Sequence, residues 1–245
     1  MRTIRVHLDM PLHVGAEIAL PDDAAQHLVR VLRLKPGDGC VVFDGHGHEF
    51  DARVVSAGKR DVLAAIVSAR EVRNESPLAL VLLQGIARGD RMDLILQKAT
   101  ELGVHAVHPV SSQRSEVKLD AERAAKRVAH WRGVVVAACE QSGRATVPRV
   151  AEPVALGDAF GALPAGGTRL LLDPVAKTSL ATVVIDPDAP VVLAIGPEGG
   201  WSPLDHDRLL AAGFIGLRLG PRVLRTETAG LAAIAALQAR FGDLG

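Results

Sequence analysis

Residues 190–229, PVVLAIGPEGGWSPLDHDRLLAAGFIGLRLGPRVLRTETA, contain two strand–loop–helix units in succession. Val191 to Ile195 form a short apolar run that is typical of a strand buried on both faces. The run ends at Gly196-Pro197-Glu198-Gly199-Gly200, where three glycines in five residues let the backbone come close to a ligand. Strand, glycine loop and helix in this order indicate an α/β protein that binds a ligand at the carboxyl ends of its strands.

The first helix after the glycine loop has a clear start signal. Ser202 is a suitable N-cap, because Pro203 then takes the first helical position and Asp205 the third. The second unit repeats the layout, with a strand at 215–219, a loop at 220–225 and a helix that opens at Thr226. The glycine loop matches neither the G-x-G-x-x-G dinucleotide pattern nor a P-loop, and a tight turn without a ligand explains it equally well.

The two loops and three further segments carry a family resemblance. They are IGPEGGWS (195–202), LGPRVLRTETA (219–229), VLRLKPGD (31–38), LQKATELGV (96–104) and EQSGR (140–144). Together they closely resemble the signature of the small-subunit ribosomal RNA uridine-N3 methyltransferases, which belong to the SPOUT class. The resemblance runs nearly end to end. It implies a C-terminal trefoil knot at about 190–230 that binds S-adenosylmethionine, although nothing in the residue pattern itself shows a knot.

Composition sets broad limits on the class of protein. The 245 residues suffice for one large or two modest domains. The formal net charge is zero, so RNA binding must come from local patches. Cys40 and Cys139 form neither a disulfide framework nor a metal site, and we expect no metal. No apolar run reaches the roughly 18 residues of a membrane helix, and the N-terminus lacks the apolar region of a signal peptide. We expect a soluble cytoplasmic protein.

Two domains are predicted from the change in pattern along the chain. Residues 1–72 show short strands, turns and one helix that starts at Pro21-Asp22-Asp23, a small β-barrel pattern that the resemblance makes a PUA-like RNA-binding domain. The polar stretch 71–77 marks the boundary. From residue 78 strands and helices alternate, which predicts a parallel α/β sheet for 73–245, the SPOUT methyltransferase domain.

Two groups of cations are candidates for RNA contact. Arg30 and Arg33 lie three apart on one helical face, with Lys35 just beyond. The segment 114–149 holds eight Lys and Arg against four Asp and Glu. A solvated helix face explains either group about as well as phosphate contact does, and the resemblance favours contact. The predicted RNA-binding residues are Arg2, Arg30, Arg33, Lys35, Arg114, Arg123, Lys126 and Arg127.

The implied reaction needs a base or a charge stabiliser. N3 of uridine is a weak acid that must lose its proton before it attacks the sulfonium methyl. Arg144 and Arg225 are the best stabilisers, in the matched motifs, of charge that develops on O2 and O4. Glu140 or Glu198 could take the proton, although Glu198 could instead hold backbone amides in its loop. No sequence argument separates these roles.

The resemblance also implies where the cofactor lies. Backbone groups of three loops, Leu172-Asp173, Ile195 to Gly200 and Leu219 to Thr226, would bind adenine and ribose, and Leu219 and Leu224 would pack on the base. The predicted cofactor residues are Leu172, Ile195, Gly196, Glu198, Gly199, Gly200, Leu219, Gly220, Leu224 and Thr226.

The final helix bears on assembly. Residues 228–239, TAGLAAIAALQA, contain no charged residue, so more than one face of the helix must be covered. A helix enclosed in its own domain is one explanation. The resemblance favours a two-fold homodimer with each active site near the subunit boundary.

Three other functions remain open. A nucleotide-binding hydrolase or oxidoreductase could use the same sheet, but the phosphate loop, the dinucleotide fingerprint and the G-x-S-x-G elbow are missing. A non-catalytic RNA-binding or ribosome-assembly protein is the second. A SPOUT methyltransferase that acts on another nucleotide is the third.

Overall fold

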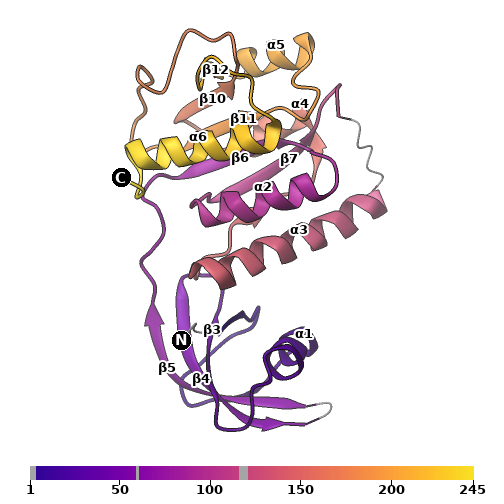
Figure 1. Ribbon diagram of the computed structural model, residues 1–245, viewed down its shortest axis with the longest axis vertical. Coiled ribbons are helices and arrows are strands. Elements are labelled where there is room, and N and C mark those ends of the chain that lie inside the picture. Colours follow the sequence, from indigo (N-terminus) through magenta and orange to yellow (C-terminus); the bar gives the residue numbers. More distant parts are fainter. Residues whose placement is uncertain (1–3, 59–60, 116–120) are drawn as a thin grey trace. The chain divides into compact units, whose positions relative to one another are not determined.

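The computed structural model describes residues 4–58, 61–115 and 121–245. The chain forms two compact units (Figure 1). The first unit comprises residues 1–75 and the returning segment 136–147, and the second comprises residues 76–135 and 148–245. The segment 136–147 therefore joins the first unit, which the composition of the sequence does not indicate.

The first unit is built on a five-stranded sheet of order β1-β3-β4-β5-β2. Its strands are β1 (Arg5–His7), β2 (Glu17–Ala19), β3 (Gly39–Phe43), β4 (His48–Ala57) and β5 (Val62–Glu71). β1 and β3 are parallel, and the other neighbours are antiparallel. This small, mostly β architecture is the one predicted from the sequence.

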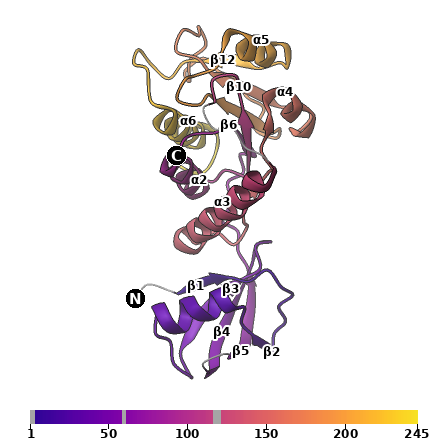
Figure 2. The same cartoon turned by 90° about the vertical axis from the view of Figure 1, so that its right-hand side faces the viewer.

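One helical segment covers the sheet of the first unit (Figure 2). α1 (Asp22–Ala25) starts where the sequence predicts and continues as the π-helical turn η1 (Gln26–Val31). Leu28 is fully buried and packs with Val42, Phe50 and Ile66 in the core of the unit. The apolar side chains that alternate along β4 and β5 thus determine which face the helical segment covers.

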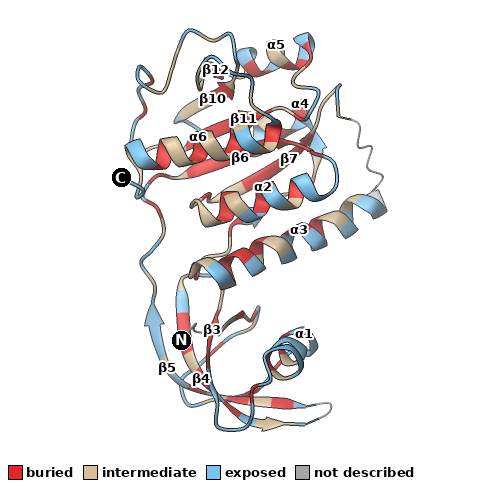
Figure 3. Cartoon of the chain, in the orientation of Figure 1, coloured by how far each residue is buried: buried red, intermediate tan, exposed pale blue. Residues whose placement is uncertain are grey.

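The second unit is built on a parallel sheet of order β12-β10-β11-β6-β7-β8, with β9 paired to β7. Its strands are β6 (Leu80–Gly85), β7 (Ala106–Ser111), β8 (Arg149–Val150), β9 (Val154–Ala155), β10 (Thr168–Leu172), β11 (Val191–Ile195) and β12 (Ile215–Leu217). Every residue of β6 and β11 is buried (Figure 3), as expected for strands covered on both faces. The predicted parallel α/β sheet is confirmed.

Helices cover both faces of this sheet (Figures 1 and 2). α2 (Asp90–Glu101) and α6 (Thr226–Phe241) lie together on one face. α4 (Leu156–Ala159), the 3₁₀ turn η2 (Phe160–Ala162) and α5 (Pro203–Ala211) lie on the other. α3 (Ala121–Ser142) runs from the second unit into the first. Within the described residues, no helix is both long enough and apolar enough to span a membrane.

The connection between β10 and β11 lies against the chain that leads from β12 to α6. Ser179 forms a bridge with Arg218, and the Arg218 N–H donates to the Thr178 carbonyl over 2.9 Å. This places residues 178–179 beside Arg218, directly after β12. The trefoil knot at about 190–230 stays a prediction of the resemblance.

Candidate active site

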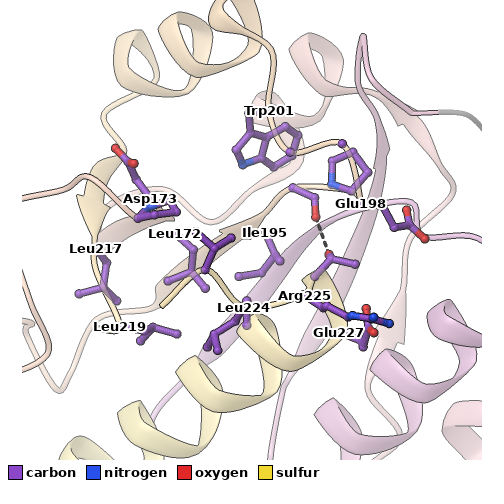
Figure 4. Close-up of a pocket in the computed structure, with 18 of the residues that line it drawn as sticks. Leu172, Asp173, Ile195, Glu198, Trp201, Leu217, Leu219, Leu224, Arg225 and Glu227 are labelled. Atoms are coloured by element: carbon purple, nitrogen blue, oxygen red, sulfur yellow. Dashed lines mark hydrogen bonds between the residues drawn. The ribbon is translucent and has the colours of Figure 1, made fainter. Parts of the chain in front are cut away.

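A cavity of about 640 Å³ lies at the carboxyl ends of β10, β11 and β12 (Figure 4). This is the edge of a parallel sheet at which α/β proteins bind ligands. The loops that follow the three strands, together with the first turns of α6, form its walls. All ten predicted cofactor residues line it: Leu172, Ile195, Gly196, Glu198, Gly199, Gly200, Leu219, Gly220, Leu224 and Thr226.

One part of the cavity wall is aliphatic. Leu172 and Ile195 end their strands, and Leu217, Leu219 and Leu224 come from β12 and the loop after it. Figure 4 shows these side chains gathered around a common space. Such a wall suits a flat apolar or aromatic group, while the surrounding loops supply backbone donors and acceptors.

Two glycines of the glycine loop leave little room for a side chain. A Cβ on Gly196 would lie 3.1 Å from Gly200 Cα and from Trp201 N. A Cβ on Gly199 would lie 3.2 Å from Arg114 Cβ. The loop therefore folds back on itself and rests against the β7–α3 loop, which keeps its backbone at the edge of the cavity.

Thr226 connects two of the predicted cofactor loops, 195–200 and 219–226. Its Oγ1 donates to the Gly196 carbonyl over 2.5 Å and accepts a hydrogen bond from Gln84 Nε2 over 3.3 Å. Thr226 is 7% exposed and Gln84 is fully buried. A hydroxyl at the start of α6 thus ties that helix to the end of β11 and to the middle of the sheet.

The start of α5 has the predicted capping geometry. Ser202 Oγ accepts the Asp205 N–H over 3.1 Å, and the Asp205 carboxylate accepts from the Ser202 N–H and hydroxyl. Pro203 is the first helical residue. Asp205 also accepts the Gln113 N–H over 3.1 Å, so the cap connects α5 to the β7–α3 loop.

Glu198 links the glycine loop to the chain after β6. Its Oε1 accepts the Arg88 N–H and an Arg91 guanidinium N–H, each over 2.9 Å. Partial burial raises the pKa of Glu198, but these hydrogen bonds outweigh burial, and the net pKa lies below the ordinary value of 4.5. A carboxylate held in this way favours the role of loop anchor over that of proton acceptor.

Arg114 makes the corresponding contact on the other side of the loop. Its guanidinium donates to the Gly199 carbonyl over 3.0 Å, and its Cβ packs against the same residue. The sequence predicts Arg114 as an RNA contact. In the structure its side chain holds the glycine loop, and nothing in the spacing of residues indicated this position.

The cavity also holds polar groups from Asp173, which belongs to a predicted cofactor loop, and from Trp201 and His206, which were not predicted. Asp173 Oδ2 lies 3.5 Å from His206 Nε2. Trp201 Nε1 is buried, and among the described residues it has no hydrogen-bond partner. His206 reaches the cavity from α5, a position that the sequence pattern does not reveal, whereas Trp201 directly follows Gly200 of the predicted glycine loop.

The comparison with known proteins now decides the family. The family model described as RNA methyltransferase domain matches residues 74–238, and the model described as RNA methyltransferase PUA domain matches residues 20–67. The chain belongs to this RNA methyltransferase family. The predicted family and the predicted PUA-like N-terminal domain are confirmed.

Individual relatives cover the methyltransferase from end to end. It is 31% identical to ribosomal RNA small subunit methyltransferase E of Buchnera aphidicola subsp. Schizaphis graminum, over 99% of this chain and 98% of the relative. A ribosomal RNA small subunit methyltransferase E from Neisseria gonorrhoeae, solved bound to S-adenosyl methionine, is 43% identical with a TM-score of 0.95. A Legionella pneumophila methyltransferase in complex with the same cofactor is 38% identical with a TM-score of 0.95. Each structure and this chain cover each other completely.

Four residues were predicted for the chemistry of the methyltransferase, and the structure brings two of them to the cavity. Arg225 and Glu198 line it. Arg144 and Glu140 belong to the first unit and are not among the described residues that line the cavity. Arg144 is buried and binds Glu75 through Nε, over 3.0 Å, and through its terminal nitrogen. Glu140 accepts the His7 N–H over 3.1 Å. Their catalytic roles stay predictions.

The predicted RNA-binding cations of the methyltransferase occupy exposed positions on each unit. Arg30, Arg33 and Lys35 are exposed in the first unit. On α3, Arg123 and Lys126 are exposed and Arg127 is half-buried. Lys126 pairs with Glu122 one turn away over 2.7 Å, as on an ordinary solvated helix face. Arg2 lies outside the described residues. Within the described parts of the chain, no group of three His, Cys, Asp or Glu is arranged to hold a metal ion.

Proposed function

We propose that the chain is an S-adenosylmethionine-dependent methyltransferase that methylates N3 of a uridine in small-subunit ribosomal RNA. The observation that carries the proposal is the three-loop cavity, in a chain that two cofactor-bound structures match over its full length. The substrate class comes from relatives named ribosomal RNA small subunit methyltransferase E. The uridine N3 position comes from the resemblance of the two loop motifs.

The residues of the cavity fit S-adenosylmethionine. Its volume of about 640 Å³ suits a ligand of this size. The aliphatic wall suits the flat adenine ring. The backbone of the loops 195–200 and 219–226 offers hydrogen-bond donors and acceptors for adenine and ribose. Trp201 Nε1 is a buried donor that has no partner among the described residues, which is expected where a ligand supplies the acceptor. Asp173 adds a carboxylate for a hydroxyl or an amino group.

The bound cofactor supplies an electrophilic methyl group on a sulfonium. The chain must orient the uridine so that N3 faces that methyl, and it must stabilise the charge that develops on O2 and O4 as N3 loses its proton. Arg225 lines the cavity and can donate to those oxygens. Glu198 has a lowered pKa and is already held by Arg88 and Arg91, so we assign it to loop anchoring.

Arg144 and Glu140 remain part of the proposal as residues that act on the bound nucleotide. Arg144 binds Glu75, and Glu140 holds the His7 N–H. Arg144→Lys keeps the charge but loses the two-pronged pairing with Glu75. Loss of this pairing lowers thermal stability in either case, so the deciding readout is the kcat of the folded variant. A catalytic role predicts a lower kcat, whereas a purely structural role predicts an unchanged kcat.

RNA contact is proposed for the exposed cations of both units. Arg30, Arg33 and Lys35 in the first unit, and Arg123 and Lys126 on α3, are suited to bind phosphates. Each lost phosphate contact should reduce the slope of log affinity against log salt by about one. A ribosomal RNA substrate also goes with the cytoplasmic location expected from the sequence.

The proposed assembly is a two-fold homodimer that uses α6. One face of the helix is buried by its own unit through Gly230, Ala233, Ile234 and Leu237. The opposite face, on which Ala232 lies, also carries no charge between residues 228 and 239. Sedimentation equilibrium at micromolar concentration tests the dimer. A monomer with full methyltransferase activity would contradict it.

Methyl transfer itself separates the proposal from its alternatives. Isothermal titration with S-adenosylmethionine and with NAD distinguishes a methyltransferase from an oxidoreductase. Transfer of labelled methyl to small-subunit ribosomal RNA from a strain lacking the protein distinguishes an enzyme from a non-catalytic RNA-binding or assembly protein. A product methylated at another nucleotide would support the third alternative.

A further inference from the structure

The chain that leaves η1 contains a backbone conformation that is unusual for its residue type. Arg33 has φ +59°, and it is the one non-glycine residue with positive φ in the described parts of the chain. Side chains of L residues disfavour this region, and helix ends that need it usually carry glycine or asparagine. Arginine at this position should therefore weaken folding by roughly 5- to 30-fold in the equilibrium constant.

Packing on both sides holds this conformation. We call residues 30–35 the Arg33 turn. The Leu32 N–H donates to the His27 carbonyl and the Leu34 N–H to the Leu28 carbonyl, each over 3.0 Å. Leu28 and Leu34 are buried in the core of the first unit. The turn is thus fixed by two hydrogen bonds and two core side chains. The π-helical turn before it is a rare element that is frequent at functional sites.

The Arg33 turn displays an unusual mixture of exposed side chains. Val31 is 62% exposed and Leu32 is 38% exposed. Arg30, Arg33 and Lys35 are also exposed and flank the two aliphatic residues in the sequence. Single exposed aliphatic residues are common, but two adjacent exposed ones with cations on both sides in the sequence are an apolar pair in a positively charged rim of chain.

We infer that the Arg33 turn is a nucleotide-binding wedge. Arg30, Arg33 and Lys35 bind backbone phosphates, and Val31 and Leu32 pack against an unstacked base of the RNA. The charge of the rim favours a polyanion over a protein surface, and apolar side chains next to phosphate-binding cations are the arrangement with which proteins separate stacked bases. This inference rests on the proposed function, because it takes RNA as the partner.

The strain at Arg33 gives the first test. Arg33→Gly should raise the Tm by about 2–4 °C, because glycine accepts the positive φ without strain. The same change should weaken binding to small-subunit ribosomal RNA and reduce the salt slope by about one. Arg33→Lys keeps both the charge and the strain, so it should leave the Tm and the salt slope near those of the wild type. A gain in Tm with unchanged RNA affinity would overturn the role of Arg33.

The aliphatic pair gives the second test, because a base contact does not release counterions. The double variant Val31→Ser/Leu32→Ser should lose about fivefold in RNA affinity, as expected when a small apolar contact is lost, with an unchanged salt slope. Its Tm should fall only modestly, since Val31 is mostly exposed and Leu32 is 38% exposed, and RNA affinity is compared at a temperature at which both proteins are folded. Unchanged affinity would overturn the wedge, and a change in sedimentation instead would assign the apolar pair to a protein contact.

Parallel measurements separate this inference from the proposed function. Wild-type protein is tested for methyl transfer to the RNA preparation that is used for binding. Transfer by the wild type together with unchanged RNA affinity in all three variants would overturn the wedge alone. Normal RNA binding without any transfer would overturn the methyltransferase proposal and leave the wedge supported by its variants.

Discussion

Thr226→Val removes one hydroxyl where the two cofactor loops meet and keeps a side chain of similar shape. In the wild type Thr226 Oγ1 donates to the Gly196 carbonyl over 2.5 Å and accepts from Gln84 Nε2 over 3.3 Å. The variant leaves the Gly196 carbonyl without this donor and leaves the buried Gln84 with one partner fewer. A buried polar group without its partner costs about 1–3 kcal/mol.

This loss divides between cofactor binding and folding. In the unbound variant the loop after β11 can leave its wild-type position, and it must then return when the cofactor binds. In that case nearly all of the loss appears as weaker S-adenosylmethionine binding, between about 5- and 150-fold. Any remainder appears as a lower free energy of unfolding, so the two losses should sum to about 1–3 kcal/mol. Isothermal titration measures the first and denaturant unfolding the second.

Thr226→Ser is the matched control, because it keeps the hydroxyl and removes only a methyl group. We expect it to bind the cofactor within a fewfold of the wild type. The reasoning is refuted if Thr226→Val matches the wild type in both measurements. It is equally refuted if Thr226→Ser loses as much affinity as Thr226→Val.

Three further predictions concern other contacts of the glycine loop and of the start of α5. The pKa of Glu198 is lowered in the folded protein, so the carboxylate stabilises the fold above pH 4.5 and this contribution is lost as pH falls below that value. Glu198→Gln should abolish this part of the pH dependence of the free energy of unfolding, and a variant with the same pH dependence as the wild type would contradict the prediction. Arg114→Ala should raise the KM for S-adenosylmethionine severalfold and leave the salt slope of RNA binding unchanged, and Arg114→Lys should have an intermediate KM. A reduced salt slope at an unchanged KM would instead support the predicted contact of Arg114 with an RNA phosphate. Ser202→Ala removes the N-cap of α5, so it should lower the free energy of unfolding by about 1 kcal/mol and the Tm, measured by calorimetry, by about 2–4 °C. An unchanged Tm would show that the cap does not stabilise the fold.

Local signals in the sequence predict much of the fold. The strand at Val191–Ile195 is where the apolar run indicates, and the helix at Pro203 starts where its capping residues indicate. The last helix opens at Thr226 as predicted. These features depend on neighbours within a few residues, and such information is present in the chain itself. Because the carboxyl ends of parallel strands share one edge, the residues after them could also be predicted to line one cavity.

The rest of the site depends on tertiary packing. His206 lines the cavity because of the way α5 packs, and Arg114 meets Gly199 across two loops that are far apart in the sequence. The ion pair of Arg144 with Glu75 depends on the return of residues 136–147 to the first unit. No periodicity, cap or spacing in the chain encodes these contacts, so the sequence could name Arg144 as a useful charge but could not give its partner.

The identity of the methylated nucleoside tests the central claim most directly. Small ribosomal subunits from a strain lacking the protein are incubated with purified protein and isotope-labelled S-adenosylmethionine. Their RNA is then digested to nucleosides for liquid chromatography and mass spectrometry. We predict label in N3-methyluridine from reactions with the wild type and a large reduction with Gly199→Val, whose Cβ would already lie only 3.2 Å from Arg114 Cβ and whose two methyl groups need further space at the edge of the cavity. Label in any other nucleoside, or no label in the RNA, would contradict the account.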